Sequence, residues 1–277
     1  MFNINLSLWN YRLLKGEIRM FNTYIFDLYG TLVDIRTDEE SWEVWRKMSL
    51  LYQYRGADYE PMELREAFEQ AVKNAVERAT KRDKESVNSK DLDEISQATK
   101  SEIKIEYVYQ ELFHNKGVEV TMDVCMHMAQ FFRSVSTCYV KLYKGALELL
   151  QELKANNKKV YLLSNAQAVF TRGELQLLGI LPYFDGLLLS SDVGYKKPDR
   201  RFYQRLLDMY HIDPATAIMI GNDYRADSMG GANVGLHTCY INSNLSPSED
   251  ANRIADMKAD FILESMDLEK VKSLILR

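Results

Sequence analysis

Short apolar runs that alternate with amphipathic stretches constrain the fold of this chain more than any other feature. The segments between the later runs carry apolar residues at helical spacing, for example Leu147, Leu150 and Leu153. Strands that alternate with helices build parallel sheets with helices on both faces. The sequence therefore predicts an α/β fold with a doubly wound parallel sheet. The expected strands lie at residues 23–28, 160–164, 186–190, 217–221, 238–242 and 259–263.

The segment between the first and second of these runs has a different composition. Residues 36–139 are rich in Glu, Lys, Gln, Ala and Met, and they contain only the glycines Gly56 and Gly117. We expect this segment to be all helix. One helix carries Trp42 after a capping-box spacing at 37–40, one opens at Pro61, and two more span about 91–115 and 123–139.

This pattern divides the chain into three parts. We expect a core domain built from residues 20–35 and 140–277, and a helical domain at 36–139 inserted after the first strand. An insert at that point would lie over the carboxyl ends of the strands, where open α/β sheets bind ligands. Residues 1–19 do not resemble the start of an α/β domain, and we expect translation to begin at Met20 rather than Met1.

Composition and charge exclude several classes of partner. The formal net charge of the 277 residues is -5, and basic residues are mixed with acidic ones, so nucleic acid is not an expected partner. The N-terminal stretch has no apolar run long enough for a signal peptide or a membrane span, which predicts a cytoplasmic protein. Cys125, Cys138 and Cys239 have no CxxC spacing and are expected to be buried free thiols. A monomer and a homodimer both fit the sequence.

Polar residues suited to chemistry follow several of the expected strands. Asp27 ends the first apolar run and is followed by Gly30 and Thr31, so its carboxylate should stand beside free backbone amides. Such a carboxylate can act as a nucleophile or as a metal ligand. Each polar residue alone is weak evidence, but together they occupy successive strand ends in order. The later ones are Ser164, Asn165, Lys197, Asp223 and Asp227.

Four segments that contain these residues resemble the motifs of the haloacid dehalogenase superfamily. The segments are FDLYGTLVD, LLSN, GYKKPDRRFY and IGNDYRADSMGGANVG. The resemblance covers most of the chain from Asn22 onward, and the helical segment resembles the C1 type of cap in that superfamily. It implies a Rossmann-like core and a hydrolase that uses an aspartate nucleophile.

The resemblance also implies roles for individual residues. Asp27 would be the nucleophile, Ser164 would bind a phosphate oxygen, and Lys197 would offset negative charge. Mg²⁺ would be the cofactor, held by Asp27, the backbone carbonyl of Tyr29, Asp223 and Asp227. Gly30, Thr31 and Asn165 would contribute to phosphate binding. Arg46, in the first helix of the insert, either faces the substrate or belongs to a helix that only packs within the insert.

Tyr29 leaves the reaction open, because most phosphatases of this superfamily carry a second aspartate at that position. The L-2-haloacid dehalogenases share the DxYGT pattern, and their halide leaving group needs no proton. The acidic pair Asp223 and Asp227 points instead to Mg²⁺ and phosphoryl transfer. The sequence therefore favours a Mg²⁺-dependent phosphatase for a small phosphorylated metabolite, with Tyr29 as a possible acid. A metal-independent dehalogenase and a non-catalytic binding module are the alternatives.

Overall fold

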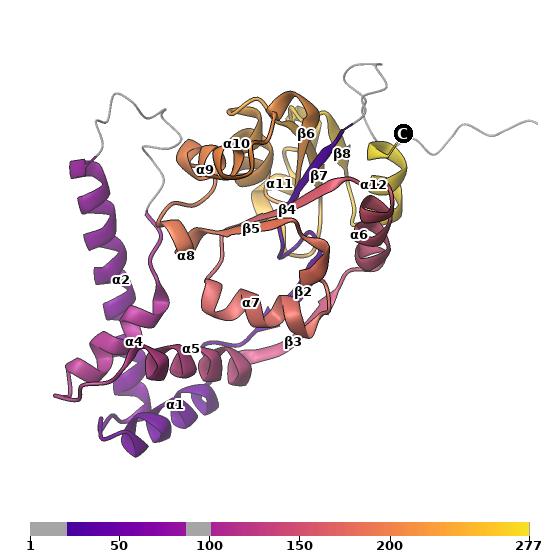
Figure 1. Cartoon of the computed structure of the whole chain (residues 1–277). Helices are drawn as coiled ribbons and strands as arrows, with labels where there is room; N and C mark the ends of the chain where they lie inside the picture. Colours follow the sequence, from indigo (N-terminus) through magenta and orange to yellow (C-terminus); the bar gives the residue numbers. More distant parts are fainter. Residues whose placement is uncertain (1–20, 87–100, 277) are drawn as a thin grey trace, which may run out of the picture.

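A six-stranded parallel sheet forms the centre of the protein in a computed structural model that describes residues 21–86 and 101–276 (Figure 1). All five strand pairs in this sheet are parallel. This result confirms the predicted fold class, and each of the six expected strands is present. In spatial order the strands are β5 (Gly186–Leu189), β4 (Lys159–Ser164), β1 (Thr23–Phe26), β6 (Ala217–Gly221), β7 (His237–Ile241) and β8 (Phe261–Leu263).

Helices cover both faces of the sheet. Side chains of β1 alternate between two apolar clusters: Tyr24 and Phe26 pack with Leu150, whereas Ile25 packs with Phe202. Successive side chains of a strand point to opposite faces, so a fully buried strand needs apolar residues at every position. The core helices are α6 (Ala146–Ala155), α7 (Ala168–Leu177), α8 (Ser190–Val193), α9 (Arg200–Tyr210), α10 (Gly230–Ala232), α11 (Ser248–Ala251) and α12 (Leu268–Ile275), with a π-helical turn at Tyr224–Met229.

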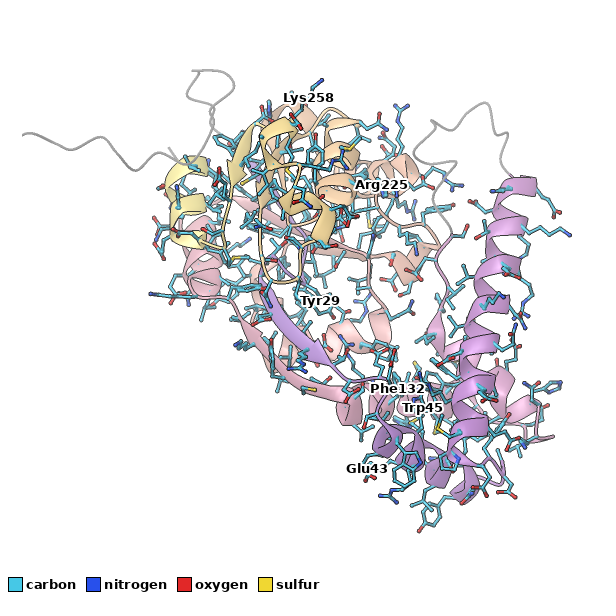
Figure 2. The ribbon with its side chains drawn as sticks, turned by 180° about the vertical axis from the view of Figure 1, so that it is seen from behind. Tyr29, Glu43, Trp45, Phe132, Arg225 and Lys258 are labelled. Atoms are coloured by element: carbon cyan, nitrogen blue, oxygen red, sulfur yellow. The ribbon has the colours of Figure 1, made fainter. Side chains whose placement is uncertain are left out.

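A separate helical layer is inserted between β1 and β4, and it extends below the sheet in Figure 1. Its own core includes Trp45, Tyr52 and Phe132, two of which are labelled in Figure 2. Trp45 and Tyr52 of the first helix are buried within this core rather than turned toward a ligand, whereas Trp42 and Tyr54 of the same helix are exposed. The helices are α1 (Trp42–Tyr54), α2 (Pro61–Ser86), α4 (Ile105–His114) and α5 (Met122–Ser136).

The prediction that this insert is all helix was wrong at its two ends. Strands β2 (Val33–Thr37) and β3 (Thr137–Leu142) pair in an antiparallel ribbon that joins the insert to the core. β2 alternates apolar and polar residues over only five positions, and β3 does not alternate throughout, since Cys138, Tyr139 and Val140 follow one another. The strand signal is therefore short, and the helical composition of the neighbouring segment concealed it. The capping box expected at 37–40 does not form, because Thr37 is the last residue of β2.

Other sequence predictions differ from the structure in detail. The third helix of the insert begins at Ile105, and residues 101–104 before it are not helical; residues 91–100 of the expected helix lie outside the described residues. The expected extra segment 1–19 and the start at Met20 lie outside them too. Cys125 and Cys239 are buried free thiols as predicted, but Cys138 is exposed. Across residues 21–86 and 101–276, no helix combines the length and apolar character needed to cross a membrane.

Candidate active site

Asp27, Ser164 and Lys197 meet at the carboxyl edge of the sheet. Asp27 follows β1, Ser164 ends β4, and Lys197 lies in the loop between α8 and α9. The hydroxyl of Ser164 donates to Asp27 Oδ1 over 3.0 Å, and the Lys197 ammonium lies 2.6 Å from the same oxygen. Within the described part of the chain, no side chain donates to the other oxygen, Oδ2. The contacts therefore orient the Asp27 carboxylate through Oδ1 and leave Oδ2 available to contact a ligand.

Lys197 also binds a second carboxylate. Its ammonium lies 2.7 Å from Asp227 Oδ1, so a single cation bridges Asp27 and Asp227. Burial and the neighbouring charges of Asp27 and Asp223 raise the pKa of Asp227, although Lys197 opposes this shift. Burial disfavours the charge of Lys197, but the two carboxylates outweigh that cost and raise its pKa. Lys197 is therefore held as the ammonium ion.

The turn after β6 positions the acidic pair. Asp227 Oδ2 accepts a hydrogen bond from the backbone amide of Asp223 over 3.0 Å, and Asp223 Oδ1 accepts from the amide of Ala226 over 2.7 Å. Gly221 packs directly against Asp227: a Cβ atom there would lie 2.1 Å from the Asp227 carboxyl group. Glycine at the end of β6 is therefore required for Asp227 to reach Lys197.

Two asparagines hold neighbouring segments in place. Asn165 binds the backbone of Lys197 on both sides, since its Oδ1 accepts from the Lys197 amide over 2.7 Å and its Nδ2 donates to the Lys197 carbonyl over 3.0 Å. Asn222 Oδ1 accepts from the hydroxyl of Thr31 over 3.1 Å. The side chain of Asn222 fills the space beside Gly30, whose φ of +86° suits a residue without a side chain. Asn222 was not singled out from the sequence.

A cavity of about 180 Å³ contains these groups. All six residues predicted to be catalytic or to bind a metal line it, which means that the structure brings them together. Gly30 and Thr31 do not line the cavity, but both contact Asn222, which does. Arg46 lies elsewhere: it is an exposed residue of α1 paired with Glu43 at 2.7 Å. The lining residues are Asp27, Tyr29, Ser164, Asn165, Lys197, Asn222, Asp223, Ala226, Asp227, Leu245 and Pro247.

The hydroxyl of Tyr29, a residue labelled in Figure 2, belongs to a polar network formed with side chains of α7 and α5. It donates to the Glu174 carboxylate and lies 3.0 Å from the Thr171 hydroxyl, both on α7. Glu174 also pairs with Arg133 of α5, with Nε 2.6 Å from Oε1. Burial and the charge of Glu174 raise the pKa of Tyr29, so the phenol stays protonated and bonded to Glu174.

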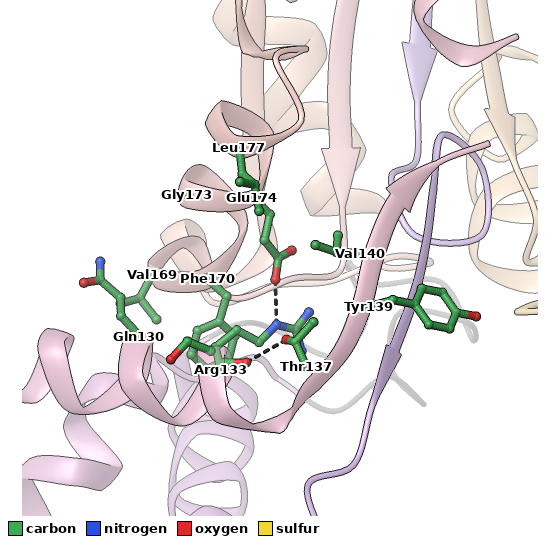
Figure 3. Close-up of a pocket in the computed structure, with 11 residues that line it drawn as sticks. Gln130, Arg133, Thr137, Tyr139, Val140, Val169, Phe170, Gly173, Glu174 and Leu177 are labelled. Carbon is green, nitrogen blue, oxygen red and sulfur yellow. Dashed lines mark hydrogen bonds and ion pairs between the residues drawn. The ribbon is translucent and has the colours of Figure 1, made fainter. Parts of the chain in front are cut away.

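The pair of Arg133 and Glu174 also forms one wall of a groove of about 620 Å³ between α5, α7 and β3, drawn in Figure 3. Phe170 and Leu177 supply apolar surface in this groove, and the guanidinium of Arg133 lies 5.3 Å from the centre of the Phe170 ring. Neither Arg133 nor Glu174 could be predicted from the sequence, because they lie in separate helices and outside every motif. Their contact links the insert to the core.

Many of the side chains that line this cavity carry oxygen atoms, which could bind a metal ion. Asp27 and Asp223 both face it, whereas Asp227 is already bonded to Lys197 and to the amide of Asp223. Within the described residues, no three His, Cys, Asp or Glu side chains are grouped closely enough to hold a metal ion by themselves. Two carboxylates with backbone oxygen and water remain a suitable set for Mg²⁺, which binds through one or two carboxylates and keeps several waters.

Comparison with known proteins agrees with this arrangement of strand-end residues. The family of haloacid dehalogenase-like hydrolases matches residues 21–235, which is most of the chain. This protein belongs to the haloacid dehalogenase-like hydrolases. The match confirms the resemblance seen in the four motifs, and it includes the helical insert as well as the strands that carry Asp27, Ser164 and Asp223.

Individual hydrolases of this family match only part of the chain. Human haloacid dehalogenase-like hydrolase domain-containing protein 3 is 30% identical over 135 residues, which cover 48% of this chain and 53% of that protein. The glyceraldehyde 3-phosphate phosphatase of Methanothermobacter thermautotrophicus is 26% identical over 133 residues, which cover 48% and 58%. The chain thus spans little more than half the length of these relatives.

A solved structure extends the likeness in fold to nearly the whole chain. The 2-haloacid dehalogenase from Pseudomonas syringae pv. tomato DC3000 is similar over 92% of this chain and 98% of its own, with a TM-score of 0.60 and 17% sequence identity. At that identity the likeness concerns the fold alone. The shared fold therefore does not choose between phosphate and halide chemistry.

Proposed function

We propose that this hydrolase is a Mg²⁺-dependent phosphatase for a small phosphorylated metabolite in the cytoplasm, with Asp27 as its nucleophile. In this proposal Asp27 Oδ2 forms a bond to phosphorus while the bond to the leaving oxygen breaks, and the leaving group takes that electron pair. Water then hydrolyses the aspartyl phosphate and regenerates the carboxylate. Lys197 and Ser164 hold Asp27 for the attack and offset negative charge as it develops.

The observation that carries the proposal is the excess of negative charge around one ammonium ion. Asp27, Asp223 and Asp227 share the cavity, and Lys197 is the single cationic side chain among its described lining residues. Lys197 already separates Asp27 from Asp227, so this pair alone does not require a metal. The additional carboxylate of Asp223 does favour a further cation, because like charges in a buried site repel one another strongly.

Mg²⁺ fits that role through its preference for hard oxygen ligands. Asp27, Asp223 and the backbone carbonyl of Tyr29 would hold the ion, with Asp227 kept in place by Lys197. The bound ion would supply charge neutralisation for the phosphate oxygens. The similarity to a relative named as a glyceraldehyde 3-phosphate phosphatase supports hydrolysis of a phosphate ester over hydrolysis of a carbon–halogen bond. The substrate in that name is an alkyl ester, so this support concerns the reaction and not the leaving group.

The environment of Tyr29 bears on which phosphate compounds would react. Its hydroxyl donates to Glu174, so it is not a free proton donor for a leaving group. Loss of a positioned general acid costs about 10²- to 10⁴-fold in rate. A leaving group that is stable without a proton avoids this loss. We therefore propose an activated phosphate, such as an aryl ester or an acyl phosphate, rather than an alkyl ester.

Dehalogenation remains the second candidate, because the same absence of an acid suits a halide leaving group. The third candidate is a binding module without catalysis. The assembled Asp27, Ser164 and Lys197 argue against it, because a protein that only binds a ligand does not need a nucleophile. One experiment separates them: release of p-nitrophenol from p-nitrophenyl phosphate and of chloride from L-2-chloropropionate, with Mg²⁺ or EDTA.

Phosphatase activity that needs Mg²⁺ and is lost in Asp27→Asn supports the proposal. Chloride release in EDTA would replace it with the dehalogenase. If neither product forms while Mg²⁺ still raises the melting temperature, the chain is a binding module.

A further inference from the structure

The loop after β7 forms part of the catalytic cavity although it belongs to none of the four motifs. We propose that this loop, residues 243–247, selects the leaving group through apolar contact with Leu245 and Pro247. The inference rests on the proposed phosphatase function and narrows its substrate class. It assigns specificity for the leaving group to a loop of the core domain. A helical insert over the strand ends would be expected to provide that specificity instead.

The residues that line the cavity support this assignment. Among the described residues, the lining comes from the ends of β1, β4 and β6, the π-helical turn after β6, the loop of Lys197 and the 243–247 loop, and none comes from α1, α2, α4 or α5. The motif residues present mostly carboxylates, amides and an ammonium ion. Leu245 and Pro247 add an apolar surface, and Leu245 is 37% exposed, which places it at the mouth of the cavity.

The loop is anchored to the β2–β3 ribbon by Asn244. Its Nδ2 donates to Asp34 Oδ1 over 3.0 Å, and its Oδ1 accepts from the Tyr143 hydroxyl. Asp34 belongs to β2 and is buried; Tyr139 and Lys141 of β3 also bind it, at 3.2 and 3.3 Å. The loop is thus fixed to the segment that directly follows Asp27 and Tyr29.

A second anchor lies in α11, directly after the loop, and contacts the turn that carries the acidic pair. Asp250, which is 2% exposed, accepts a hydrogen bond from the backbone amide of Tyr224 over 2.8 Å. Tyr224 directly follows Asp223. The loop also closes on itself, since the Ser243 amide donates to the Ser246 hydroxyl over 2.9 Å. An apolar wall held at both ends can discriminate between ligands because its position is fixed before binding.

The size and polarity of the cavity define the substrate class. Its volume of about 180 Å³ corresponds to roughly six water molecules. That space suits a phosphoryl group and the first atoms of a leaving group, with the remainder of a larger group lying against Leu245. We therefore infer a phosphate ester whose leaving group is acidic and carries a flat apolar part, such as an aryl or enol ester.

Two esters with acidic leaving groups test this inference. p-Nitrophenyl phosphate has a flat apolar leaving group, and acetyl phosphate has a small polar one, so neither needs a general acid. In Leu245→Ala, the ratio of kcat/KM for p-nitrophenyl phosphate to kcat/KM for acetyl phosphate should fall about 10-fold, as expected when apolar contact is lost from a specificity pocket. Asn244→Ala should lower the same ratio by releasing the loop. Leu50→Ala, at an exposed leucine of α1, is the matched control and should leave the ratio unchanged.

The possible outcomes separate this inference from the proposed function. A selective loss for p-nitrophenyl phosphate in the Leu245 and Asn244 variants supports the inference. An unchanged ratio, or equal losses for both esters, overturns it and leaves the phosphatase intact. If the wild-type protein with Mg²⁺ hydrolyses neither ester, the proposed function fails and the inference fails with it.

Discussion

Lys197 and Asp227 form a buried ion pair, with 2.7 Å between Nζ and Oδ1 and only 2% of either side chain exposed. Lys197→Met should therefore lower the free energy of unfolding by about 3–5 kcal/mol, because it leaves a buried carboxylate without its partner. Hydrolysis should fall at least about 10³-fold, since the cation beside Asp27 is lost as well. Chemical denaturation and p-nitrophenyl phosphate assays measure the two effects.

A double variant separates the effect on stability from the effect on catalysis. Adding Asp227→Asn to Lys197→Met removes one of the two carboxylate charges that lost their partner, so it should recover part of the stability but not the activity. Lys196→Met changes the neighbouring lysine and serves as the control: its stability and its activity should both stay near the wild-type values. Recovery of activity in the double variant would contradict a catalytic role for Lys197.

Ser164 donates a charge-assisted hydrogen bond to the proposed nucleophile. Such bonds contribute about 1.5–3 kcal/mol, so Ser164→Ala should lower kcat/KM by about 10- to 100-fold. Ser164→Thr keeps the hydroxyl and should retain most of the activity. Ser134→Ala removes an exposed hydroxyl outside the site and serves as the control. Equal activity of the alanine and threonine variants at position 164 would argue against this bond.

Tyr29 should contribute to stability more than to proton transfer, because its hydroxyl is bonded to Glu174. Tyr29→Phe should keep the slow hydrolysis of an alkyl phosphate such as glycerol phosphate within about 3-fold of the wild type, since the loss of a working acid would cost at least about 10²-fold for a leaving group that needs a proton. It should also lower the free energy of unfolding by about 1–2 kcal/mol. A double-mutant cycle with Glu174→Gln tests whether the two side chains are coupled.

Tyr29→Asp tests the role of the leaving group at the same position. A carboxylic acid there could protonate an alkyl leaving group, so the rate for alkyl phosphates should rise relative to that for aryl phosphates. An unchanged ratio would rule out the explanation based on leaving groups.

Asp83 of α2 binds Arg201 of α9 through two contacts, at 2.6 and 2.7 Å, and so ties the insert to the core. Its hydrogen bond from Arg201 lowers the pKa of Asp83. The stabilisation is therefore complete above the ordinary carboxyl pKa of about 4, and it is lost as pH falls through the lowered pKa of the folded state. Asp83→Asn should melt about 2–4 °C below the wild type at pH 7.

The difference between wild type and Asp83→Asn should shrink as pH falls below about 4. Thermal melting across that range measures it. Asp58→Asn, at an exposed aspartate of the insert, controls for the loss of one negative charge. A difference that persists at low pH would mean that Asp83 stabilises the protein without its charge.

Arg46 was expected to contact substrate if its helix faced the site, but in the structure it is exposed and paired with Glu43. An exposed pair of this kind contributes about 0–1 kcal/mol. Arg46→Met should therefore change KM for p-nitrophenyl phosphate by less than about 2-fold. A large increase in KM, with stability unchanged, would show that Arg46 does contribute to substrate binding.

The sequence predicted the parts of the site that depend on strand ends. Asp27, Ser164 and Asp223 each follow an apolar run, and parallel strands end at the same edge of a sheet, so their meeting follows from the order of the strands. Lys197 lies in a loop, and its place in the site was inferred from the motif that contains it. The position of the helical insert followed from the break in strand alternation.

Contacts between distant segments could not be predicted in this way. The pair of Arg133 and Glu174 depends on how two helices pack across the boundary of the insert, and neither residue has a distinctive sequence context. Leu245 is equally ordinary in sequence, and it reaches the cavity because Asn244 and Asp250 fix its loop. A single sequence does not encode such proximity in any local pattern.

The β2–β3 ribbon has a consequence for how such a protein could change. Thr37 and Thr137 stand opposite each other in the ribbon, so the chain leaves the core and returns to it at one place. The helical segment connects the two paired strands of the ribbon, as a turn connects the two strands of a hairpin. It therefore does not affect the order of the strands in the six-stranded sheet. A different helical module, or a short turn, could be grafted at these two threonines while Asp27 and Ser164 keep their places, so the catalytic centre and its cover can evolve separately.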